Sequence, residues 1–133
     1  MLVLNRQRKQ PISRRKVVAF LKELTGTLNV ANLEFSVVFV TDEAMRRYNR
    51  DYRGFDKSTD VLSFTGDAPY LGDILISTET AYNQARRSRT LDFERNLRRL
   101  MLHGLLHLIG HDHETDNGEM RNIERRFRRR FQC

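Results

Sequence analysis

The sequence predicts a single α+β domain in which about five α-helices cover a small mixed four-stranded β-sheet. The length of 133 residues suits one domain with its own core. Strand-like and helix-like patterns follow one another in the order strand, helix, strand, helix, two strands, three helices. The two consecutive strands are joined by a short turn, which favours an antiparallel pair. We therefore expect residues 1–133 to form one layered domain, with the helices packed on one sheet.

The first half of the chain alternates strands with helices. Residues 2–4 predict a short strand, and a serine N-cap predicts a helix over residues 13–24. Residues 33–40 are rich in β-branched and aromatic side chains, which is typical of a buried strand. A second helix is expected over residues 42–49, and the polar residues 50–59 predict a loop.

The second half begins with a hairpin and ends with three helices. Residues 60–64 and 71–77 predict two strands, followed by a helix over residues 78–87. Apolar residues surround the axis of the next helix, residues 92–109, so we expect it to be central and buried. The last helix, residues 117–131, has a narrow apolar stripe and a dense arginine face. That face is either a solvated surface or a grip on nucleic acid.

Composition narrows the class of function. The formal net charge of +7 suggests a polyanionic partner, with nucleic acid the natural candidate. The longest apolar run is too short to cross a bilayer, and the N-terminal residues lack a signal-peptide layout, so we expect no membrane association. The single cysteine, Cys133, excludes an intrachain disulfide and fits a reducing compartment such as the cytoplasm. The sequence leaves the oligomeric state unknown.

A histidine motif is the strongest sign of chemistry. His103 and His107 are four residues apart, so both rings project from one face of the predicted helix. Gly110 is suited to end that helix, after which the reversed chain can carry His113 back to the first two rings. The spacing matches that of the metzincin proteases. We interpret His103, His107 and His113 as ligands of one zinc ion, with His111 as a competitor for the third position.

The residue after the first histidine separates this chain from a peptidase. The proteases have a glutamate there as general base, whereas this chain has Gly104. Three protein ligands leave one coordination position open, which is typical of catalytic zinc. Such an ion lowers the pKa of bound water or polarises a phosphoryl oxygen. Asp112 and Asp73 are candidates to orient a ligand imidazole, although ordinary loop and strand roles are at least as plausible for both.

Three motifs together resemble the YbeY family of bacterial endoribonucleases. They are His-Gly-x-Leu-His-Leu-x-Gly-His-Asp-His from His103, Thr-Asp-Val-Leu-Ser-Phe from Thr59, and Leu-Gly-Asp-Ile from Leu71. The resemblance implies a metal-dependent, single-strand-specific RNA hydrolase that usually holds zinc. It also implies a role in ribosomal RNA processing, including 3′-end maturation of 16S rRNA, and in ribosome quality control. Single-stranded RNA, rRNA and the ribosome or small-subunit proteins are then the expected partners.

The resemblance also assigns residues. It makes His103, His107 and His113 the metal ligands and Arg53 the functionally important arginine, which assists phosphate binding. Without the resemblance we would favour a surface arginine paired with Asp51 or Asp56. Two positions depart from the family pattern: Ser58 and Thr65 replace prolines, which predicts looser loops around Arg53.

Two alternative interpretations assign the chain to other functional classes. A metal-dependent peptidase would use the same metzincin-like ligand frame but would need a base from elsewhere in the chain. A non-catalytic RNA-binding or ribosome-binding module would use the metal for structure alone, and a fourth protein ligand would support it. The sequence also leaves open whether water or the RNA 2′-hydroxyl attacks the phosphate.

Overall fold

The computed structural model describes residues 1–110, 118–131 and 133. The strands are β1 (Leu2–Asn5), β2 (Glu34–Val40), β3 (Val61–Thr65) and β4 (Tyr70–Ser77), and the helices are α1 (Arg14–Thr27), α2 (Asp42–Arg53), α3 (Thr78–Arg87), α4 (Phe93–Leu108) and α5 (Glu119–Phe131). Their order along the chain is the predicted one. None of the described helices is long and apolar enough to span a membrane.

The sheet has the strand order β1-β2-β4-β3. β1 and β4 run parallel to β2, whereas β3 pairs antiparallel with β4 through the expected hairpin. The hairpin needs glycine at position 72, where φ is +136° and a Cβ atom would lie 2.0 Å from the carbonyl oxygen of Phe64. The mixed four-stranded sheet with five helices confirms the predicted α+β class.

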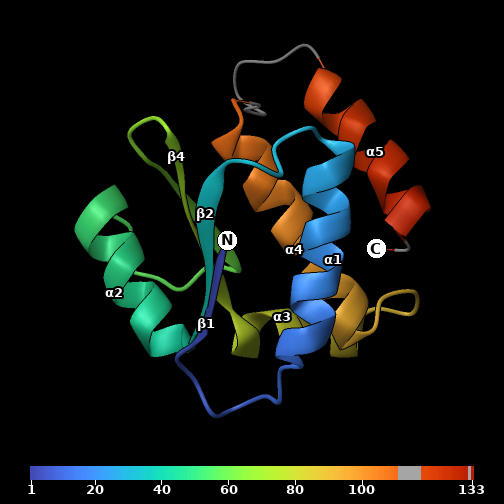
Figure 1. Cartoon of the computed structure of the whole chain (residues 1–133). Helices are drawn as coiled ribbons and strands as arrows, with labels where there is room; N and C mark the ends of the chain where they lie inside the picture. The colour runs from blue at the N-terminus through green and yellow to red at the C-terminus, as the bar shows by residue number, and fades with distance from the viewer. Residues whose placement is uncertain (111–117, 132) are drawn as a thin grey trace.

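One face of the sheet carries the main core. Alternate residues of the central strands, such as Val37, Phe39, Ile74 and Ile76, point to this face and are fully buried. α1 and α4 pack against them, and α5 completes the layer by placing Phe131 in the same cluster. In Figure 1 these three helices lie together on one side of the sheet. The predicted central position of α4 is therefore confirmed.

The opposite face of the sheet is only partly covered. Here α2 contributes Met45 to a small cluster with Leu62, Leu75 and Val40. Figure 1 shows α2 alone on this side, across the sheet from α4. The end of the sheet near β1 remains open on this face, and Leu2 is 51% exposed there.

Two helix ends differ from the sequence prediction. α1 continues past Gly26 to Thr27, because nothing near Gly26 obstructs the helix and Leu28 closes it by bonding to the carbonyl of Leu24. α2 continues to Arg53 instead of ending near Asn49. Its end is set by Gly54, whose φ of 77° supplies the left-handed cap. Arg53 therefore lies on the last turn of a helix and not in a loop.

Candidate metal centre

α4 begins close to the predicted start at residue 92, because the side chain of Asp92 caps it by accepting a hydrogen bond of 2.8 Å from the backbone N–H of Arg95. It ends where the sequence predicted, since Ile109 is its C-cap and Gly110 follows with a φ of +105°. The last two turns place His103 and His107 beside buried leucines of the main core. The backbone that carries both imidazoles is therefore held by packing on several sides.

The two imidazoles face one another. His103 Nε2 and His107 Nε2 are 3.1 Å apart, and the ring centroids are 4.6 Å apart with planes inclined at 67°. Two nitrogen ligands of a tetrahedral zinc ion, each about 2.0–2.1 Å from the metal, are roughly 3.3 Å apart. The spacing and chemistry of this pair therefore fit a bound zinc ion.

The third predicted ligand, His113, lies outside the described residues, as do His111 and Asp112. Within residues 1–110, 118–131 and 133, no three His, Cys, Asp or Glu side chains gather as a metal site. The described part of the site therefore consists of two of the three predicted ligands, and the assignment of His113 remains a prediction.

A carboxylate from α5 supports the histidine pair from behind. Glu124 Oε1 is 3.0 Å from His103 Nδ1, the ring nitrogen that does not face His107. The Glu124 side chain is only 15% exposed, and that of His103 29%. Such a carboxylate fixes the orientation of a ligand imidazole and leaves its other nitrogen for the metal.

Sequence reasoning missed this role for Glu124. The contact joins residues 21 positions apart and depends on how α5 packs against α4. The available signal was that Glu124 follows Ile123 on the border of the apolar stripe, where a polar side chain can reach a neighbouring helix.

Asp73, a predicted candidate for orienting an imidazole, lies elsewhere. Its Oδ1 accepts hydrogen bonds of 2.5 Å from Ser36 Oγ and from the hydroxyl of Tyr70. These residues line a cavity of about 440 Å³ with Tyr52 and other residues, on the face of the sheet that α2 partly covers. Burial and the bond to Asp73 raise the pKa of Tyr70. The alternative interpretation, a hydrogen-bonding strand residue, is the one the structure supports.

Gly104 has a packing role that the sequence did not reveal. A Cβ atom at this position would lie 2.6 Å from Ile74 Cγ2 and 3.2 Å from Ser63 Oγ. Ser63 also donates a hydrogen bond of 3.3 Å to the carbonyl oxygen of Gly104. Glycine thus lets α4 lie close to β3 and β4, and a glutamate side chain does not fit there.

Arg53 is exposed at the end of α2, on the other side of the sheet from α4 (Figure 1). Its guanidinium carbon lies 5.5 Å from the centroid of the Phe55 ring. The structure places Arg53 in no hydrogen bond or ion pair with the described histidines. It brings His103 and His107 together and leaves Arg53 apart from them.

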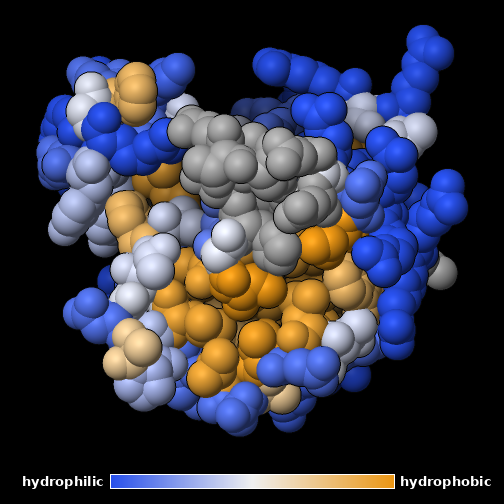
Figure 2. All heavy atoms as spheres, turned by 90° about the horizontal axis from the view of Figure 1, so that it is seen from above, coloured by the Kyte–Doolittle hydropathy of each residue, from blue (hydrophilic) through white to orange (hydrophobic). Residues whose placement is uncertain are grey.

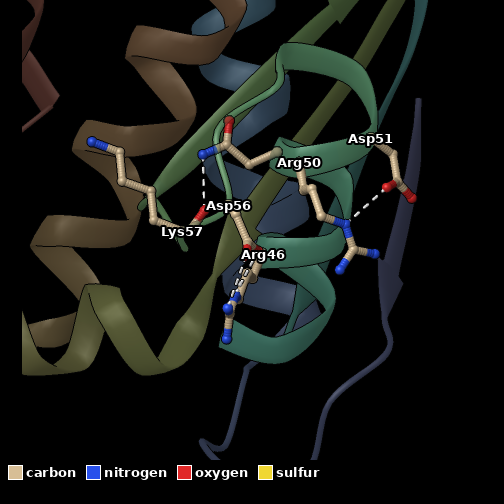
Figure 3. A network of polar contacts seen from close by, with 6 residues as sticks. Arg46, Arg50, Asp51, Asp56 and Lys57 are labelled. Atoms are coloured by element: carbon tan, nitrogen blue, oxygen red, sulfur yellow. Dashed lines mark hydrogen bonds and ion pairs between the residues drawn. The ribbon is translucent and has the colours of Figure 1, made fainter.

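The carboxylates expected to pair with Arg53 bind other arginines. Asp56 accepts bonds of 2.8 and 3.1 Å from Arg46, which lower the pKa of Asp56, and Asp51 accepts one of 3.1 Å from Arg50. Figure 3 shows both pairs along α2 and the loop that follows it. Within the described residues Arg53 is therefore not engaged by either acid, which removes the main argument for a merely structural surface role.

Ser58 ties the loop after Arg53 to the rest of the fold. Its hydroxyl donates a bond of 3.1 Å to Asp42 Oδ1, which also accepts one of 2.6 Å from Thr80 and a short one from Ser77. Burial raises the pKa of Asp42, but these bonds outweigh burial and lower it below the usual value. The Ser58 hydroxyl therefore tethers this loop to the start of α2, while the looser loops predicted around Arg53 stay a prediction.

The fold and the paired histidines define a small α+β protein with a candidate metal centre at the end of its central helix. A family model described as Endoribonuclease YbeY matches residues 2–132, so the chain belongs to this family. This confirms the predicted family and the predicted class of enzyme, that of an endoribonuclease.

Individual relatives agree with this assignment. The chain is 37% identical over 138 residues to a protein named endoribonuclease YbeY from Geobacter sulfurreducens, covering 97% of this chain and 91% of that protein. It is 48% identical over 95 residues to the protein of the same name from Solibacter usitatus, covering 71% of this chain and 63% of that protein. The solution structure of TM1509 from Thermotoga maritima is similar with a TM-score of 0.71 and 25% identity, over 96% of this chain and 86% of that one.

Proposed function

We propose that this chain is a metal-dependent endoribonuclease that cleaves single-stranded RNA. His103, His107 and His113 hold one zinc ion, and Arg53 assists phosphate binding. The observation that carries the proposal is the pair of imidazole nitrogens 3.1 Å apart on a buried helix, with a carboxylate behind one of them. Membership of the endoribonuclease YbeY family supports RNA as the substrate.

The histidine pair is preorganised for a cation. Both rings belong to a helix whose neighbouring side chains Leu105 and Leu106 are fully buried, so the ligands have little freedom to separate. Glu124 holds the His103 ring by Nδ1, which leaves its Nε2 lone pair for the ion. When bound, the ion supplies Lewis acidity toward a phosphate oxygen and a nucleophile competent at neutral pH.

Arg53 is proposed to bind the RNA phosphate. A guanidinium presents N–H groups in a planar fork that matches a phosphate, which a lysine ammonium does not reproduce. The nearby acids are already engaged by Arg46 and Arg50, so Arg53 remains available for an anionic ligand. It is exposed on the last turn of α2, so its guanidinium is accessible to a phosphate of the RNA.

The peptidase alternative has the weaker support. It requires a general base near the ligands, and the contact between Gly104 and Ile74 leaves no room for a glutamate at that position. The non-catalytic module requires a fourth protein ligand. Glu124 approaches the ring nitrogen that faces away from His107, so it supports an imidazole and is not positioned as a further ligand beside the Nε2 pair.

The cellular role is proposed from the family resemblance. It comprises 3′-end maturation of 16S rRNA and ribosome quality control in the cytoplasm, with the ribosome or small-subunit proteins as partners. The net charge of +7 is consistent with binding to ribosomal RNA.

A substrate panel tests the proposed activity. The protein is purified without a metal-binding tag, its metal content is measured, and it is incubated with single-stranded RNA, double-stranded RNA and casein. We expect cleavage of single-stranded RNA alone, its loss after chelation, and its return when zinc is added. Cleavage of casein, or RNA cleavage that survives chelation and the His107→Ala substitution, would refute the proposal.

A further inference from the structure

A pocket of about 290 Å³ lies beside the histidine pair, between α4 and α5. Its polar wall is formed by Arg99 and His103 from α4, Glu124 and Arg128 from α5, and Asp60 at the start of β3. The proposed metal chemistry does not use the two arginines. Their position next to a proposed ligand raises the question of what they bind.

Helical spacing places the four charged or ionisable residues of α4 and α5 at two heights along the helix axes. Arg99 is four residues before His103 on α4, and Arg128 is four residues after Glu124 on α5, so each arginine lies one turn from its neighbour on the same helix face. His103 and Glu124 join the helices at one level. Arg99 and Arg128 therefore face the pocket together at the other level, about 6 Å further along the helix axes.

The two arginines carry positive charge that no acidic side chain of the described residues offsets directly. In the described part of the chain, neither Arg99 nor Arg128 forms an ion pair with an Asp or Glu side chain, and Arg128 Nε donates a long bond of 3.4 Å to the main-chain oxygen of Cys133. Burial raises the pKa of the Cys133 thiol, and the positive charges of Arg98, Arg128 and Arg99 act against it. Side chains of both helices thus concentrate cations at one place.

The acids of the pocket are occupied by other groups. Asp60 accepts hydrogen bonds of 2.7 Å from the backbone N–H of Val61 and 3.1 Å from Gln84 Nε2. Glu124 faces His103. The guanidinium groups of Arg99 and Arg128 line the same pocket without an Asp or Glu partner among the described residues, which suits an anion with several acceptor oxygens.

We propose that Arg99 and Arg128 form a subsite for a backbone phosphate of the RNA, next to the phosphate that reacts at the histidines. This rests on the proposed function and extends it, because it assigns part of the arginine-rich C-terminal helix to substrate binding. In the view of Figure 2, hydrophilic side chains cover the edge of the molecule that carries α5, and the exposed Arg125, Arg126, Arg129 and Arg130 of that helix make its surface cationic. Both arginines are positioning residues and take no part in bond breaking.

The test compares two pairs of substitutions in the metal-loaded protein. One variant carries Arg99→Gln with Arg128→Gln, and the matched control carries Arg125→Gln with Arg129→Gln, which removes the same charge from exposed positions of α5 outside the pocket. The probe is a fluorescent, fully 2′-O-methylated single-stranded RNA, whose integrity is checked after each titration. Binding is measured by anisotropy at several salt concentrations.

The pocket pair is expected to weaken binding about tenfold and to lower the slope of log K against log salt by about 0.7, since the subsite holds one phosphate and each phosphate contact on a single strand contributes about 0.7. The control pair should change the slope by less than half of this. An equal effect of both pairs would show that the RNA binds a diffuse cationic surface. No effect of the pocket pair would show that Arg99 and Arg128 do not bind the RNA. Either result overturns the proposal.

A charge-preserving variant guards against misfolding. Arg99→Lys with Arg128→Lys retains the net charge but loses the planar fork, so the salt slope should stay near the wild-type value while affinity falls a few-fold. Wild-type affinity in this variant would contradict recognition by guanidinium groups. If the wild-type protein cleaves no RNA but the pocket pair weakens binding of the probe more than the control pair does, the proposed function fails while the subsite stands, so the two failures are distinguishable.

Discussion

The ends of α4 and α2 carry the two parts of the proposed site, and they are built differently. α4 is enclosed by the main core, and its last turns hold His103 and His107 beside fully buried leucines. α2 covers the opposite face alone and ends in the exposed Arg53, held by the Gly54 cap and by surface ion pairs. Packing in the core thus fixes the two proposed metal ligands, whereas Arg53 is exposed and is bonded to neither Asp51 nor Asp56.

The largest effect is expected at the buried end of α4, which carries His103 and His107. His107→Ala should reduce zinc from one ion per chain to near zero and slow cleavage of single-stranded RNA by about 10³-fold or more, because the Lewis acid is lost. Metal analysis after gentle isolation and initial rates measure this. Arg50→Ala, which removes only an exposed pair with Asp51, is the control and should retain both zinc and rate. Unchanged zinc content in His107→Ala would refute the metal centre.

A single added carbon atom tests the close packing of α4 against the sheet. Gly104→Ala places a Cβ within 2.6 Å of Ile74 Cγ2, so we expect the free energy of unfolding to fall by about 1–3 kcal/mol. Urea denaturation measures it. Gly26→Ala is the matched control, because nothing lies within 4 Å and alanine favours the helix by roughly 0.5–1 kcal/mol. Equal stability of the two variants would contradict the packing role of Gly104.

The substitution Glu124→Gln tests the contact between α5 and α4, the helix that carries the two histidines. This change keeps the shape but removes the charge that supports His103, so zinc affinity should fall by about 10–100-fold. Competition with a chromophoric chelator measures the affinity without any assay of activity. Glu94→Gln, at an exposed surface pair with Lys16, serves as control. Wild-type zinc affinity in Glu124→Gln would show that the contact of Glu124 with His103 does not support metal binding.

At the exposed end, Arg53→Ala should slow RNA cleavage by about 10–100-fold while zinc content and thermal stability stay unchanged, because two charge-assisted bonds to phosphate are lost. Arg53→Lys should recover only part of the rate, since a point charge replaces the fork. Steady-state rates on a short single-stranded RNA measure both. A wild-type rate for Arg53→Ala would exclude the residue from the reaction.

The smallest effect is expected at Asp42, the first residue of α2, which accepts hydrogen bonds from Ser58, Ser77 and Thr80. The pKa of Asp42 is lowered in the folded protein below its usual value of 3.8, so its contribution to stability is present above that value and is lost as the pH falls through the folded pKa. Asp42→Asn should therefore be less stable than wild type by about 1 kcal/mol at pH 6, with the difference shrinking below pH 4. Urea midpoints across this range measure it, and a difference that grows on acidification would contradict the sign.

Local patterns were enough for most of the fold. The apolar periodicity of residues 92–109 predicted a central helix, and the structure has α4 there, with Asp92 as its N-cap. The short turn after Phe64 predicted the antiparallel hairpin. The end of α2 was missed because polar residues continue to Arg53, and the left-handed conformation of Gly54, which sets the boundary, is a weak signal among loop residues.

Residue spacing was enough to predict that His103 and His107 are one helical turn apart, with both imidazoles on one face of the helix. The support of His103 by Glu124, the place of Asp73 on the other face of the sheet and the packing role of Gly104 became clear only from the folded chain. The two kinds of contact differ in their range along the chain. Spacing along one helix is fixed by its geometry, whereas contacts between α4, α5 and the sheet depend on how the whole core packs.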